Sequence, residues 1–313
     1  MAGGATALVL GATGGIGGAV AAALHRHGWP VRCMARKPPS INDGRFDWVA
    51  GDAMRRDDVI AAASGVSLII HAVNPPGYRR WAELAPPMLE NTIAAARAAG
   101  GARIMLPGNV YNFDPETTPL IRPDSPASPK SRKGEVRVAL EARLEEASAF
   151  SPTTILRAGD FFGPGARSSW FAQTMARPGR PLRRIVNPAR GAGHAWAYLP
   201  DLAEAFALLA GREQAPRFER LGFAGHLDQT GEEMIAAIRR VVGRELRVHP
   251  FPWTLMRILA PFSGFPREAA EIAPHWRAPQ RLDNSTLVAA IGAEPRTALD
   301  EAMRATLKEM GCL

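Results

Sequence analysis

Two cations stand four residues apart in the segment SRKGEVRVALEARL, which covers residues 131–144. The segment has helical spacing, and at about 100° per residue Lys133 and Arg137 project within roughly 60° of Leu140 on the apolar stripe. Because a buried charge is costly without a partner, inward-facing cations favour a role in holding an anionic ligand or moving a proton. The alternative is a surface ion pair between Arg137 and Glu141.

A glycine-rich turn near the amino end indicates a second kind of chemistry. The motif GATGGIG lies between an apolar segment and a helical one. Glycines allow a tight turn and let backbone N–H groups at a helix N-terminus approach a pyrophosphate, whose charge the helix dipole favours. A tight turn without a ligand is the alternative. We predict a dinucleotide site at Gly11, Thr13, Gly14, Gly15, Ile16 and Gly17.

The end of the second predicted strand indicates which dinucleotide is bound. Arg36 and Lys37 close the segment VRCMARK. A site for NAD usually carries Asp or Glu here to bind the ribose hydroxyls, whereas arginine accommodates the 2′-phosphate of NADP. Two solvated cations at a strand end are the simpler interpretation. Because the acid is missing in either case, the sequence favours NADP(H).

These residues need a framework, and the first half of the chain alternates strand-like and helix-like segments. That alternation predicts a Rossmann-type, doubly wound α/β fold with a parallel sheet. The predicted strands cover residues 5–10, 30–35, 66–72, 103–106 and 153–156. The predicted helices cover residues 16–27, 57–63, 86–99 and 134–149. Residues 107–132 form a long loop, and loops of that length are usually functional.

Beyond residue 159 the elements become shorter and are separated by Pro and Gly. Helices are expected near residues 230–242, 251–259 and 298–310. We expect residues 1–159 to form an NADP-binding Rossmann domain. Residues 160–313 are then mainly a smaller, interleaved substrate-binding lobe, with residues 192–212 returning to the first domain.

Composition limits the class of protein. The chain has 313 residues, of which 46% are apolar, enough for a globular core. Cys33 and Cys312 lie far apart without metal-ligand spacing, so we expect neither disulfides nor a metal, and a reducing cytoplasm fits. We see no signal segment and no apolar run of the roughly 18 residues that a membrane span needs. We therefore expect a soluble protein without a membrane partner.

The net charge of +8 comes almost entirely from arginine, which favours anionic partners such as phosphate-bearing cofactors. The arginines form no single basic helix, and no nucleic-acid-binding module is recognisable. We expect a small-molecule substrate, no nucleic acid, and a monomer or homodimer.

Several motifs together resemble the extended or atypical short-chain dehydrogenases/reductases, the epimerase/dehydratase-like superfamily. The resemblance runs over essentially the whole chain. Besides the glycine turn, it rests on GD at 51–52, HAV at 71–73, LRAGDFFGP at 156–164, HAWAYLPDLAEA at 194–205 and LDNSTLVAAIGAEP at 282–295.

The resemblance implies positions around the cofactor. Asp52 corresponds to a family residue that contacts adenine. His71, Ala72 and Val73 correspond to the segment beside the cofactor, and Ala158 belongs to the strand and turn next to the nicotinamide. Each of these five residues is therefore expected to line the cofactor site.

The departures from the family concern its catalytic set of a Ser or Thr followed by Tyr-x-x-x-Lys. Lys133 falls on the Tyr and Arg137 on the Lys, while the Ser position falls on Pro107 or Gly108. The usual acid–base hydroxyl is therefore absent. Our hypothesis is that Arg137 donates to the nicotinamide ribose and Lys133 acts as the general acid. Tyr111, in the family's V-Y-G position, ranks below Lys133.

Two functions remain open from the sequence. The first is an NADP(H)-dependent oxidoreductase or epimerase-like enzyme that acts on a small polar or anionic substrate. The second is an NADP(H)-binding sensor without turnover. Six aromatic residues either line a substrate pocket or simply pack the second lobe: Phe161, Phe162, Trp170, Phe171, Trp196 and Tyr198.

Overall fold

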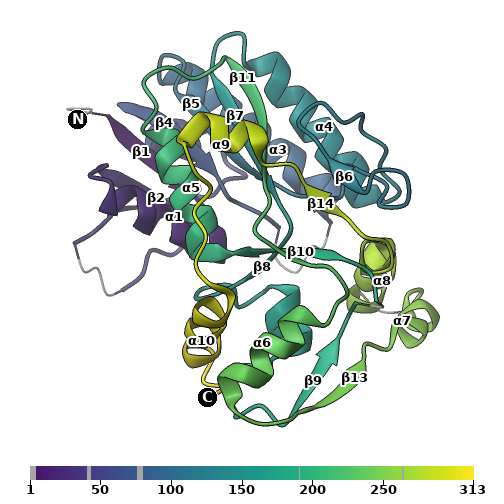
Figure 1. Ribbon diagram of the computed structural model, residues 1–313. Coiled ribbons are helices and arrows are strands. Elements are labelled where there is room, and N and C mark those ends of the chain that lie inside the picture. Colours follow the sequence, from purple (N-terminus) through teal and green to yellow (C-terminus); the bar gives the residue numbers. More distant parts are fainter. Residues whose placement is uncertain (1–4, 41–43, 76–79, 190, 263) are drawn as a thin grey trace.

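Seven parallel strands form the central sheet of the computed structural model, which describes residues 5–40, 44–75, 80–189, 191–262 and 264–313 (Figure 1). The strands are β1 (Thr6–Leu10), β2 (Val31–Ala35), β3 (Asp47–Ala50), β4 (Val66–His71), β5 (Arg103–Gly108), β7 (Thr153–Ala158) and β11 (Phe218–Phe223). Their spatial order is β11-β7-β5-β4-β1-β2-β3. The predicted Rossmann-type fold is therefore confirmed.

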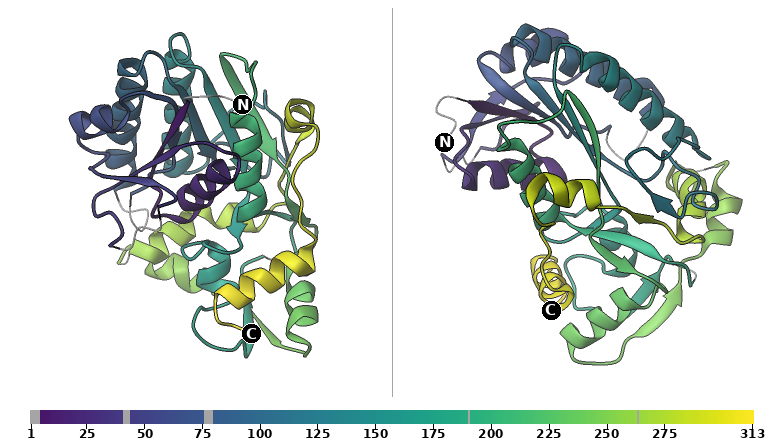
Figure 2. Two further views of the ribbon diagram at one scale, coloured as in Figure 1. Left: turned by 90° about the vertical axis from the view of Figure 1, so that its left-hand side faces the viewer. Right: turned by 45° about the horizontal axis from the view of Figure 1, so that its top comes forward.

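Helices cover both faces of this sheet, as the continuous apolar strands require (Figure 2). The helices α1 (Gly15–Arg26), α5 (Leu199–Ala210) and α9 (Ser285–Ile291) cover one face, and α2 (Arg56–Ala62), α3 (Trp81–Ala98) and α4 (Arg132–Ala147) cover the other. Since side chains alternate along a strand, Val9 packs into the first layer and Leu10 into the second.

A second lobe, formed by later parts of the chain, lies below the central sheet in Figure 1. Its strands are β8 (Asp160–Phe162), β10 (His194–Tyr198), β12 (His226–Asp228), β9 (Arg184–Asn187) and β13 (Arg247–Pro250). Its helical segments are η2 (Phe171–Met175), α6 (Glu233–Val242), α7 (Trp253–Leu259), α8 (Gly264–Ile272), η3 (Ala273–Trp276) and α10 (Leu299–Glu309). The short strands β6 (Leu120–Ile121) and β14 (Arg281–Leu282) pair beside it.

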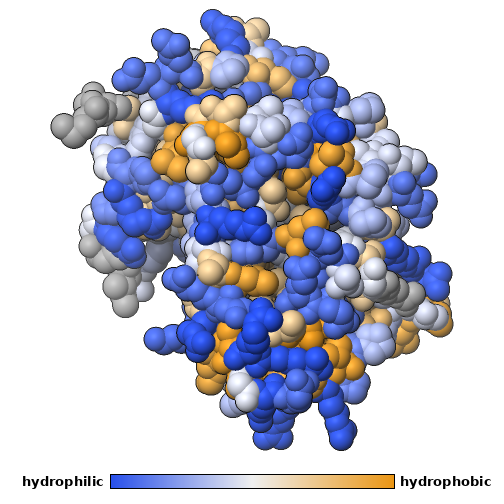
Figure 3. Space-filling model, viewed as in Figure 1, coloured by the Kyte–Doolittle hydropathy of each residue, from blue (hydrophilic) through white to orange (hydrophobic). Residues whose placement is uncertain are grey.

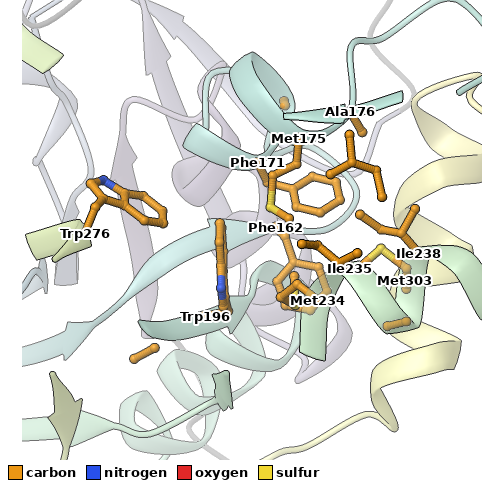
Figure 4. Packing of buried hydrophobic residues seen from close by; sticks show 14 of the residues in the cluster. Phe162, Phe171, Met175, Ala176, Trp196, Met234, Ile235, Ile238, Trp276 and Met303 are labelled. Carbon is orange, nitrogen blue, oxygen red and sulfur yellow. The ribbon is translucent and has the colours of Figure 1, made fainter. Parts of the chain in front are cut away.

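The lobe has its own apolar core, which contains most of the aromatic residues considered above. Phe162 and Phe171 are completely buried, and their rings pack beside Met234 and Ile235 of α6 (Figure 4). Trp196 stands between Trp276 and Phe171. These aromatic side chains therefore pack the lobe, as the simpler interpretation holds.

The structure also differs from the sequence-based elements: β6 interrupts the predicted loop at residues 107–132, and the central layer differs in one helix and two strands. Helix α3 begins at Trp81, whereas the prediction started it at residue 86, where prolines usually mark a helix start. In the structure Pro86 and Pro87 lie in the second turn of the helix, despite their missing N–H donors. The strands β3 and β11 were not predicted. Neither is a continuous apolar run, since charged residues such as Asp47 and Glu219 interrupt them.

Of residues 192–212, α5 packs against the central sheet, whereas β10 lies in a sheet of the second lobe, and later elements join the central sheet as well. The strand β11 is its edge, and α9 packs against the same core. Both come after parts of the second lobe in the sequence, so the order of the elements along the chain does not reveal that they belong to the central layer. The division at residue 159 stays a prediction.

The surface shown in Figure 3 is mostly hydrophilic, with smaller apolar patches between charged residues. Within the described part of the chain, no helix is both long and apolar enough to cross a bilayer.

Candidate cofactor and active site

The glycine turn lies where the strand order of the sheet reverses, between β1 and β4. Gly11 follows β1 with a φ of +89°, and a Cβ there would lie 2.6 Å from the carbonyl oxygen of Ala72 after β4. A Cβ on Gly17 would lie 2.2 Å from the carbonyl oxygen of Gly11. The close packing of the turn therefore excludes side chains at both positions, at the crevice where doubly wound sheets bind ligands.

Gly14 differs from these two glycines. It caps α1 with a φ of −89°, and a Cβ on it would meet only the carbonyl oxygen of Gly11, at 3.3 Å. Thr13 and Gly14 are exposed, no side chain caps the helix, and its first turn, which holds Gly15 and Ile16, has no acidic residue. Open N–H groups at a positive helix end fit a pyrophosphate, so these residues suit the cofactor that the sequence predicts.

The ends of β2 and β3 lie side by side next to this turn. Arg36 and Lys37 are exposed beyond β2, where a phosphate on the adenosine ribose could meet them. Asp52 follows β3, and its Oδ1 accepts the backbone N–H of Met54 at 3.0 Å. The structure thus brings these three residues to one edge of the crevice.

The carboxyl ends of β4 and β5 hold Arg137 and His71 close together. The guanidinium of Arg137 donates to the carbonyl oxygen of Pro107 at 3.2 Å and lies over the ring of Trp81 at 4.9 Å. Burial and, less strongly, the charge of Arg137 lower the pKa of His71 to about 3, so this imidazole is neutral. Its Nδ1 lies 2.7 Å from the hydroxyl of Thr92.

The remaining predicted cofactor residues flank these groups. Ala72 and Val73 are partly exposed beyond β4. Ala158 is buried at the end of β7, where it pairs with Phe223. The roles assigned to these residues stay predictions.

Lys133 lies in the first turn of α4, buried as its helical position predicted. Its ammonium group forms ion pairs with Glu268 and, at 3.8 Å, with Glu271, both on α8. The backbone N–H of Lys133 also donates to Glu271 at 2.8 Å. Its protons are therefore directed at two carboxylates of the second lobe, an arrangement that competes with proton donation to a substrate.

Glu141 has partners other than the one considered from the sequence. Arg157 of β7 donates to both of its carboxylate oxygens, at 2.6 and 3.3 Å, and Arg220 of β11 donates at 3.3 Å. This buried network fastens α4 to the sheet, so Glu141 serves the fold.

Tyr111 is buried beside the first turn of α4. A Cβ on Gly134 would lie 2.2 Å from the carbonyl oxygen of Tyr111, so only glycine lets the loop and the helix approach this closely. The Tyr111 ring lies 5.1 Å from that of His275 on η3. The structure thus brings Tyr111 towards the second lobe.

Asp160 and His194 form a pair that sequence reasoning missed. Nε2 of His194 lies 2.8 Å from Oδ2 of Asp160. Both residues stand in segments that carry the family resemblance, 156–164 and 194–205. The available signal was a carboxylate in the segment that the family places next to the nicotinamide and an imidazole at the start of a second segment that carries the resemblance.

No cluster of three or more His, Cys, Asp or Glu side chains that could hold a metal occurs among the described residues. The candidate site consists of the glycine turn, Arg36 and Lys37 beyond β2, Arg137 of α4 beside the end of β5, and the polar groups around α4 and β8.

The strand order and the glycine turn have the arrangement in which Rossmann-type folds bind dinucleotides. Residues 11–133 match the family model described as NAD(P)H-binding. The prediction of an NAD(P)-binding region is confirmed by this match.

Two solved structures have this fold over nearly the whole chain. One is MoeE5 in complex with UDP-glucuronic acid and NAD, with 18% identity, a TM-score of 0.74 and coverage of 97% of this chain and 98% of the other. The other is a UDP-glucuronic acid 4-epimerase mutant from Bacillus cereus with NAD, with 14% identity, a TM-score of 0.77 and coverage of 98% and 99%.

Over 173 residues the chain is 28% identical to a 3-diazoavenalumate denitrifying reductase from Streptomyces sp.. That match covers 50% of this chain and 57% of the relative.

Proposed function

We propose that the chain is an NADP(H)-dependent oxidoreductase or epimerase/dehydratase-like enzyme that acts on a small polar or anionic substrate. The observation that carries this proposal is the glycine turn at the β1–β4 crevice, with an uncapped helix end beside it. Arg36 and Lys37 are exposed beyond β2, and no Asp or Glu stands at this strand end. Both facts support NADP(H) over NAD(H).

The relatives support enzymatic turnover. The structures that share the fold include an epimerase named for a UDP-sugar, and the sequence relative is named as a reductase. A nicotinamide cofactor would supply hydride chemistry in this site. Of the chain's own residues, Arg137 would hold the cofactor ribose, and the first turn of α1 would bind the pyrophosphate.

A sensor without turnover is the second candidate, and the ion pairs of Lys133 favour it. The residue in the family's proton-donor position is bound to Glu268 and Glu271 of the second lobe. Cofactor binding at Arg137, one helical turn away, would then reach α8 through Lys133.

The deciding experiment combines calorimetric titration with an assay of NADPH consumption over a panel of aldehydes, ketones and nucleotide sugars. We expect NADPH to bind and at least one compound to be reduced. Arg137→Met should weaken NADPH binding about tenfold through the lost ribose contact, and Lys133→Met should leave that affinity nearly unchanged. Tight NADPH binding without turnover over the whole panel would favour the sensor, and absence of binding would refute both candidates.

A further inference from the structure

The Asp160–His194 pair links two parallel strands of the second lobe. Asp160 opens β8, and in the strand register it lies opposite Trp196 of β10. His194 stands two residues before Trp196 on the same face of that strand. Because a carboxylate accepts, the 2.8 Å contact places a proton on Nε2 of His194.

Aromatic rings hold the imidazole of His194 in place. The ring of Trp276 stacks on it with centroids 3.8 Å apart and an angle of 13°, and Trp196 meets it edge-on at 5.1 Å. The side chain of His194 is only 7% exposed. Water is therefore largely excluded from the imidazole, which strengthens its hydrogen bond to Asp160.

Asp160 keeps one oxygen open. Its side chain is 17% exposed, and among the described residues its Oδ1 has no hydrogen-bond partner. Two buried aspartates differ from it: Asp228 of β12 accepts three backbone N–H groups at the start of α6, and Asp201 of α5 accepts the backbone N–H and the hydroxyl of Thr297. Those two carboxylates serve the fold, whereas Asp160 presents an accessible acceptor.

The position of Asp160 connects the pair to the cofactor crevice. Asp160 follows Ala158 at the carboxyl end of β7, the edge along which a dinucleotide extends from the glycine turn. The same segment reaches that turn, because a Cβ on Gly15 would lie 2.7 Å from the carbonyl oxygen of Gly165. The segment from Asp160 to Gly165 thus runs beside the crevice.

We propose that Asp160 is the proton-transferring group of this site and that His194 is its positioning residue. This inference rests on the proposed function, which supplies the nicotinamide. In the oxidation of an alcohol, Oδ1 of Asp160 would take the O–H proton, and a bound NADP⁺ would supply the acceptor for the hydride that leaves the carbon as the C–O bond becomes a carbonyl. Nε2–H of His194 stabilises and orients the carboxylate throughout. In reduction, a bound NADPH would supply the hydride to the carbonyl carbon, and the protonated Asp160 would return its proton to the carbonyl oxygen.

Several groups surround the pair and enter its pH dependence. His275 of η3 is close enough for the charges of Asp160, His194 and Asp114 to act on it. Burial, the largest effect, lowers the pKa of His275, which favours a neutral imidazole there. On the other side, Asp228 of β12 faces His194 in the strand register, but its carboxylate is occupied by α6.

The test uses the full chain with NADPH and the carbonyl compound that it reduces fastest. Asp160→Asn, which keeps the shape of the side chain, should lower kcat about 100-fold while leaving NADPH affinity unchanged. Because the transferred proton passes through Asp160, the pH dependence of kcat should differ between the wild type and Asp160→Asn. His194→Gln should lower kcat less and leave KM for the carbonyl compound near the wild-type value.

Glu204→Gln is the matched control, because Glu204 forms a comparable pair with His27 between α1 and α5. It should leave kcat and its pH dependence unchanged. Thermal unfolding of each variant shows whether a loss of kcat reflects a loss of fold.

An NMR measurement tests the pair without turnover. The Nε2 proton of His194 should give a slowly exchanging signal that moves when NADP⁺ binds and is absent or displaced in Asp160→Asn. Turnover by Asp160→Asn at the wild-type rate would overturn the inference while leaving the proposed enzyme intact. A His194 signal that NADP⁺ leaves unmoved would overturn it as well, whereas failure to bind NADP(H) would refute the proposed function itself.

Discussion

Lys133 of α4 and Glu268 of α8 form an ion pair that joins the central sheet layer to the second lobe. The two residues are 135 positions apart in the chain. Glu271, one helical turn further along α8, adds a second carboxylate and accepts the backbone N–H of Lys133. The position that the family uses for its proton donor is therefore also a structural connection between the two parts of this chain.

This connection predicts a loss of stability on replacement of Lys133. Lys133→Met leaves two partly buried carboxylates without their cation and should lower the free energy of unfolding by about 1–3 kcal/mol. Urea unfolding of Lys133→Met, Glu268→Gln and the double variant measures the coupling, which should be about 0.5–3 kcal/mol. Lys130→Met is the control, because the Lys130 side chain is 59% exposed in its pair with Asp114. Strictly additive effects would contradict an energetic link.

Gly14 and Gly17 of the glycine turn are predicted to differ: substitution of the first should affect cofactor binding, and substitution of the second should affect stability. Gly14→Val should abolish NADPH binding with little change in Tm, because a side chain there meets only one backbone oxygen, at 3.3 Å, but occupies the space expected for the pyrophosphate. Gly17→Ala should lower Tm markedly, since its Cβ would lie 2.2 Å from the carbonyl oxygen of Gly11. Calorimetric titration and thermal unfolding separate the two effects. Normal NADPH binding by Gly14→Val would place the pyrophosphate elsewhere.

The cations beyond β2 predict the cofactor preference. NADPH should bind at least tenfold more tightly than NADH, a difference of about 1.4 kcal/mol. Arg36→Ala should reduce this preference by weakening NADPH binding and leaving NADH binding unchanged, because only NADPH carries the 2′-phosphate. Arg180→Ala removes an exposed cation from the second lobe and controls for the loss of net charge. An unchanged preference in Arg36→Ala would count against the assignment.

The buried His71 predicts that stability falls in acid. Its pKa is lowered from 6.5 in the unfolded chain to about 3, chiefly by burial, so the unfolded state binds more protons between these values. The free energy of unfolding contributed by His71 is therefore fully present above pH 6.5 and falls by about 1.4 kcal/mol per pH unit as pH decreases towards 3. His71→Asn should flatten this slope, which urea unfolding at several pH values measures. Equal slopes would mean that other groups dominate acid unfolding.

Local sequence was sufficient for the elements that follow a simple spacing. Continuous apolar runs predicted β1, β4 and β7, and helical periodicity predicted the inward direction of Lys133 before its surroundings were known. The edge strands β3 and β11 could not be found in this way. Their partly exposed, charged residues lack a clear pattern, and β11 pairs with β7 only after the chain has crossed the second lobe.

The sequence by itself determined the Rossmann-type fold and the glycine turn, because both depend on residue types at short, regular spacing. Only the tertiary structure decided the partners of the polar side chains. Glu268 meets Lys133, and Asp160 meets His194, because α8, β8 and β10 bring together residues that lie far apart in the chain. Spacing along one helix or strand carries no information about such contacts, since the distances between elements are set by the packing of the whole molecule.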